Sequence, residues 1–87
     1  MLKGEYETGF RKGLNEARYA DNPEEVKIPE VDDNNLASIG YADGIDYGKY
    51  LVMVGMKYAI KEENLIAVID KSFMRACDKK EKVKKYK

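Results

Sequence analysis

Few side chains in this sequence have the type and spacing that catalysis or metal binding requires. The 87 residues include one cysteine and no histidine, which excludes Cys-His and Ser-His nucleophile pairs and the usual zinc sites. Acids such as Glu24 and Glu25 are adjacent rather than spaced as in a calcium-binding loop. Asp43 and Asp46 stand three residues apart with no nucleophile signal near them. We therefore predict a protein that is not an enzyme, with no catalytic residue, metal site or cofactor.

Tyrosines and lysines are better candidates for recognising a partner. Seven tyrosines are present, and tyrosine is enriched at interface hot spots. The predicted partner-binding residues are Tyr47, Tyr50, Tyr58, Lys57 and Lys61. The same tyrosines could instead be half-buried core residues whose hydroxyls reach water, or could stack on single-stranded RNA. Met53 and Met56 add a soft apolar patch that could seal a homodimer.

Charge is balanced over the whole chain but segregated along it. Sixteen basic and sixteen acidic residues give a net charge of zero, whereas residues 21–33 hold six acids and one lysine, and residues 79–87 hold six lysines and one acid. Residues that could contact phosphate or an acidic surface are Lys79, Lys80, Lys82, Lys84 and Lys85. The same lysines could simply solvate a helix end and complement its dipole. Zero net charge is atypical of a general nucleic-acid-binding protein.

Hydrophobic periodicity predicts a single all-α domain of three helices, spanning residues 1–87. Tyr6, Phe10 and Leu14 share one helical face near the start of the chain, and Cys77 lies on the apolar stripe of the last helix. A strand is the alternative for Tyr50–Met56. The expected elements are a helix at about 2–19, an extended acidic linker at 21–34, a helix at about 35–60, a helix at about 63–80 and a basic tail at 79–87.

Glycine spacing is the most regular pattern in the chain. Five glycines form two sets with four-residue steps, and Gly9 and Gly40 are 31 residues apart; the predicted helix-packing residues are Gly9, Gly13, Gly40, Gly44 and Gly48. A glycine inside a helix costs about 1 kcal/mol relative to alanine, so this repeat needs a reason. Steps of four place each set on one helical face, where a second backbone can approach closely. We predict two helices that cross antiparallel, glycine face on glycine face, with the linker reversing the chain.

Paired glycine–aromatic–x–x–glycine motifs also suggest a family. Gly9-Phe10-Arg11-Lys12-Gly13 and Gly40-Tyr41-Ala42-Asp43-Gly44, separated by Asn22-Pro23, resemble motifs of the small helical ribosome modulation factor-like proteins. The resemblance covers about residues 6–48 and implies a two-helix core that binds ribosomal RNA. The chain differs from that pattern in its second motif without tryptophan, its acidic linker, its zero net charge and its additional helix.

The overall interpretation is a small interaction protein, an inhibitor or adaptor that docks on a larger protein target and is of a kind that phages or mobile elements could encode. A ribosome- or RNA-binding modulator of translation is the alternative. The longest uncharged apolar run, Tyr50–Met56, is far shorter than the roughly 20 residues that span a bilayer. Residues 1–13 carry charges throughout and lack the apolar segment of a signal peptide. We therefore expect a cytoplasmic protein without a membrane partner.

Overall fold

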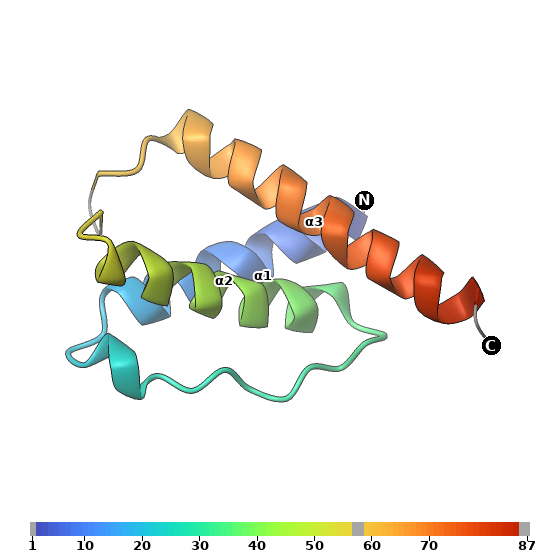
Figure 1. The fold of residues 1–87 in the computed structure, drawn as a ribbon, viewed down its shortest axis with the longest axis horizontal. Helices are drawn as coiled ribbons and strands as arrows, with labels where there is room; N and C mark the ends of the chain where they lie inside the picture. The colour runs from blue at the N-terminus through green and yellow to red at the C-terminus, as the bar shows by residue number, and fades with distance from the viewer. Residues whose placement is uncertain (1, 57–58, 86–87) are drawn as a thin grey trace.

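A computed structural model describes residues 2–56 and 59–85, and the surroundings of the side chains at 3–56 and 59–78. Its elements are the helices α1 (Leu2–Arg18), α2 (Leu36–Met53) and α3 (Glu62–Lys85), with a short 3-10 helix, η1 (Pro23–Glu25), in the linker (Figure 1). Within these described residues there is no strand. The predicted all-α class with three helices is thus confirmed, and residues 50–53 are helical.

The pairing of α1 with α2 brings the two glycine sets together. A β-carbon added at Gly44 would lie 2.8 Å from the carbonyl carbon of Phe10 and 2.9 Å from the backbone nitrogen of Leu14. The other four glycines of the repeat face the opposite helix in the same way, with an added β-carbon less than 3.0 Å from a backbone oxygen. The two backbones are therefore in direct contact along the crossing, and no side chain larger than hydrogen fits there.

The direction of this pair differs from the prediction. Gly9 faces Ala37 near the start of α2, whereas Gly48 faces Ala17 near the end of α1. Along the crossing, residue numbers therefore increase in the same direction in α1 and in α2. The two helices run parallel, as Figure 1 also shows. The predicted antiparallel crossing was wrong.

The linker makes the parallel arrangement possible. An 18-residue helix such as α2 is about 27 Å long, and the segment between Arg18 and Leu36, extended at roughly 3.3 Å per residue, can return over that length. Two contacts hold it against α2: the ammonium of Lys49 donates to the carbonyl of Val26 at 2.8 Å, and the backbone N–H of Asp32 donates to the hydroxyl of Ser38 at 3.1 Å. The linker is thus an extended connection that runs back along α2, and not a tight turn.

Both ends of α2 are set by capping residues. At its start the side chain of Asn35 accepts a hydrogen bond from the backbone N–H of Ser38. At its end Gly55 adopts φ 75° and donates to the carbonyl of Val52, while the N–H of Met56 donates to the carbonyl of Leu51 at 2.8 Å. These paired bonds form a Schellman motif, which needs a left-handed residue. The helix therefore ends at Met53 and not near residue 60 as predicted.

Helix α3 runs opposite to α1 and covers one side of the pair. Glu62 meets Arg11, while the ring of Phe73 contacts that of Tyr6 in a tilted arrangement, with centroids 5.4 Å apart. The buried core of the three helices consists of Tyr6, Phe10, Leu14, Leu51, Leu65 and Ile69. Cys77 is half-buried. The backbone of α3 remains helical to Lys85, so residues 81–85 of the predicted tail are part of the helix, and the last two residues lie outside the described part of the chain.

Candidate functional site

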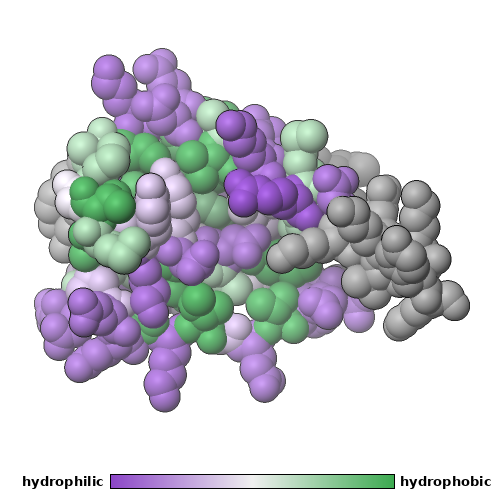
Figure 2. Space-filling model, viewed as in Figure 1, coloured by the Kyte–Doolittle hydropathy of each residue, from purple (hydrophilic) through white to green (hydrophobic). Residues whose placement is uncertain are grey.

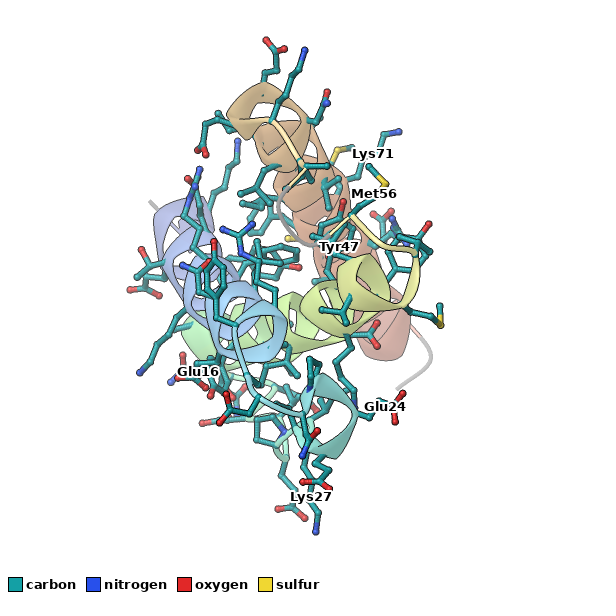
Figure 3. All side chains as sticks on the ribbon, turned by 90° about the vertical axis from the view of Figure 1, so that its left-hand side faces the viewer. Glu16, Glu24, Lys27, Tyr47, Met56 and Lys71 are labelled. Carbon is teal, nitrogen blue, oxygen red and sulfur yellow. The ribbon has the colours of Figure 1, made fainter. Side chains whose placement is uncertain are left out.

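A group of exposed apolar side chains lies where α2 ends. Four large side chains gather there within seven residues: Tyr50 is 50% exposed, Met53 76%, Val54 42% and Met56 45%. We call these four residues the end patch. Figure 2 shows hydrophobic surface at this end of the molecule, and in Figure 3 Met56 lies on the outside of the helices.

Helix geometry and the Gly55 turn explain why these side chains point outward. One face of α2 is occupied by the glycine crossing, so Tyr50 and Met53, three residues apart, share a face directed elsewhere. Asp46 is exposed one turn before Tyr50 on the same face. Val54 is the residue that caps the end of α2, and Met56 follows the Gly55 turn, so both lie beyond the last helical residue. The patch is therefore apolar with an acidic neighbour.

The predicted partner-binding tyrosines do not share one environment. The ring of Tyr47 lies 5.9 Å from that of Phe10 and 6.0 Å from that of Tyr50, on which it stacks. Tyr47 is half-buried and packs against the core, and burial raises the pKa of its hydroxyl. Tyr50 is the exposed member of this row of three rings. Figure 3 shows Tyr47 well inside the outline of the molecule.

The lysines predicted to bind a partner also do not form one described group. Lys61 is exposed, immediately before α3 begins. Lys57 and Tyr58 lie outside the described residues, as do the side chains of the basic segment from Lys79 onward. The backbone places that segment at the C-terminal end of α3, which extends past the α1–α2 pair in Figure 1. The end patch and the basic segment are thus at opposite ends of the molecule.

A buried hydroxyl joins the three helices, and the sequence analysis missed it. The hydroxyl of Tyr6 on α1 donates to the carboxylate of Asp43 on α2 at 2.6 Å, and lies 2.7 Å from the hydroxyl of Ser72 on α3. Because one phenol proton serves one acceptor, Ser72 is the donor in the second bond. Burial, together with the hydrogen bond to Asp43, raises the pKa of Tyr6 far above its ordinary value of 10.0. The group therefore stays neutral at physiological pH and acts as a structural link.

The acidic residues weighed for catalysis have other roles. Asp43 accepts a hydrogen bond from Tyr6, whereas Asp46 is exposed, so the two carboxylates have different surroundings. Among the residues with described side chains, no three Cys, Asp or Glu groups are close enough to hold a metal ion. No helix in this part of the chain is both long and apolar enough to cross a membrane.

No family model, curated protein or solved structure matches this chain. The resemblance to the ribosome modulation factor-like proteins therefore stays a prediction. An interpretation of function depends on the chain's own surfaces, among them the end patch with its four exposed apolar side chains.

Proposed function

We propose that the protein is a non-enzymatic interaction module that docks on a larger protein through the end patch, as an inhibitor or adaptor. The observation that carries this proposal is the exposure of four large apolar side chains within one short segment. Isolated exposed apolar residues are normal, but a group of them marks an interaction surface.

The composition of the end patch supports the same proposal. Tyrosine and methionine are both enriched in the centres of interfaces, and methionine adapts its shape to different partners. Two charged residues, Asp46 before the patch and Lys61 after it, provide the start of a polar rim. The stacking of Tyr50 on Tyr47 holds one anchor in a fixed orientation, which lowers the entropy lost on binding.

The test compares two exposed methionines. Met53 is 76% exposed in the end patch and Met74 is 65% exposed on α3, so serine at either position removes apolar surface with little loss of stability. A partner is captured from a lysate of expressing cells with the unchanged protein, purified, and titrated against each variant. We expect Met53→Ser to weaken binding about tenfold or more and Met74→Ser to leave it unchanged. Equal affinities for all three proteins would show that the end patch is not the docking surface.

Binding to RNA is the alternative function, and the continuous helix through the lysine-rich segment favours it. Lysines on a helix that extends beyond the core could follow a phosphate backbone. Replacing Lys82, Lys84 and Lys85 by glutamine would then lower RNA affinity and reduce its dependence on salt by about one unit of slope for each phosphate that is no longer neutralised. An unchanged salt dependence would exclude this segment as the part that binds RNA.

A further inference from the structure

Helix α3 is attached to the rest of the domain in a way that a second chain could reproduce. Its buried contacts come from side chains of its own stripe, chiefly Leu65 and Ile69. Three polar contacts fix its position: Lys3 with Asp70, Arg11 with Glu62 at 2.5 Å, and the Tyr6–Ser72 hydrogen bond. These three polar contacts join α3 to α1, and none depends on both residues belonging to one chain.

Gly55 lies where the chain leaves α2 on its way to α3. Its φ of 75° turns the backbone out of the direction of α2. A β-carbon at this position would meet nothing within 4 Å, so the conformation depends on backbone preference and not on local crowding. With helical φ at residue 55, α2 would continue in its own direction past Met53, and the connection to α3 would leave the helix farther along that direction.

We propose that two copies of this chain exchange α3, with Gly55 as the hinge. In such a dimer each α3 occupies the site on the partner's α1–α2 pair and makes the contacts it makes in the monomer. The free-energy difference between the two forms then depends mainly on the hinge conformation and on protein concentration. A net charge of zero avoids long-range repulsion between two copies. The exchange does not depend on the end patch having a partner protein.

The first test changes the hinge preference. Alanine disfavours the left-handed conformation by roughly 1 kcal/mol, about fivefold per hinge, so Gly55→Ala should lower the dimer dissociation constant about thirtyfold. Gly4→Ala is the matched control, because Gly4 lies in α1 and a β-carbon there also meets nothing within 4 Å. Molecular mass is measured by light scattering from micromolar to millimolar concentration, after helical content has been checked by circular dichroism. A Gly55→Ala variant that stays monomeric like Gly4→Ala would overturn the proposal.

The second test shows which chain supplies α3, and it also works on the unchanged protein. Equal amounts of ¹⁴N- and ¹⁵N-labelled chains are unfolded together, refolded at high concentration and treated with a carbodiimide, which joins the paired Lys3 and Asp70 directly. Because equal amounts of the two labels pair at random, exchange predicts that about half of the cross-linked peptides from the dimer fraction carry mixed labels. A dimer whose Lys3–Asp70 links are all within one label would be a side-by-side assembly, and the absence of any dimer at millimolar concentration would equally contradict exchange.

Discussion

The two interfaces of this small domain are built in opposite ways. Between α1 and α2 the backbones touch, and five glycines provide the contact surface by having no side chain. Between α1 and α3 the contact comes from apolar side chains at helical spacing, with polar groups at its edges. The first interface consists of many weak dispersion contacts over a close approach, and the second consists of side-chain burial.

This difference predicts how each interface responds to change. A backbone contact cannot relax around a new atom without moving a whole helix, so substitutions there have large effects. An interface of side chains can rearrange rotamers, so truncation has a graded cost. The α1–α2 crossing is therefore the rigid part of the fold, and α3 is the part expected to open first.

The largest effect is expected for Gly44→Leu at the crossing. The added side chain would start less than 3.0 Å from the backbone of α1 at Phe10 and Leu14, so the helices must separate. We expect a loss of about 3 kcal/mol or more of the free energy of unfolding, a large fraction of the stability of a small domain. Chemical denaturation followed by circular dichroism measures it, with Gly4→Ala as the glycine whose replacement meets no neighbour. A Gly44→Leu midpoint equal to that of the unchanged protein would refute the crossing geometry.

The second-largest loss of stability is expected for Ile69→Ala on α3. Ile69 is 1% exposed, so the truncation leaves a cavity and should cost about 3 kcal/mol. Because the truncated side chain belongs to α3, amide hydrogen exchange should rise most in α3 and least in α1 and α2. Ile66→Ala is the control, since Ile66 is 43% exposed on the same helix. Equal acceleration of exchange in all three helices would show that the two interfaces open together.

The sequence predicted the helices and the glycine crossing but not the direction of the pair. Glycines at four-residue steps look the same whichever way the helix runs, so the pattern has no polarity. The length of the linker is the signal that could have decided the direction, because a chain that only reverses needs far fewer residues than lie between Arg18 and Leu36. The end of α2 was missed for a related reason: the apolar run continues to Met56 and hides the helix stop at Gly55.

The candidate site was predictable in part. Tyr50 and Met53 stand out by their types, but residues 47 and 50 lie on nearby faces of a helix, so only the packing of Tyr47 against the core, where it meets Phe10, decides which one is covered. The hydrogen bonds of the Tyr6 hydroxyl could not be predicted from the sequence, because its partners come from two other helices. Contacts of this kind depend on tertiary arrangement and leave no local pattern.

A smaller effect is expected for Tyr6→Phe, which tests the polar link between the two interfaces. The change removes one buried hydroxyl and leaves Asp43 and Ser72 without it, at a cost of about 1 to 2 kcal/mol. The folded-state pKa of Tyr6 is raised above its ordinary 10.0, so its contribution is complete below pH 10 and declines as the pH rises above that value. The stability difference between the two proteins should therefore shrink above pH 10. Denaturation at pH 8 and pH 11 measures it, and a difference that grows with pH would contradict a neutral buried donor.

The smallest effect is expected for Glu62→Gln at the exposed edge of the α1–α3 interface. Arg11 lowers the pKa of Glu62, so the ion pair stabilises the fold above pH 4.5 and its contribution is lost as the pH falls below that value. Arg11 also pairs with Glu7 at 3.0 Å and keeps that partner in the variant, which limits the loss. Exposed pairs are screened by salt, so the difference in melting temperature should shrink further in 1 M sodium chloride. Glu63→Gln removes the same charge one position along without touching this pair. If the two variants melt alike at low salt, the Arg11–Glu62 pair does not stabilise the fold, and the other contacts of α3 hold its edge.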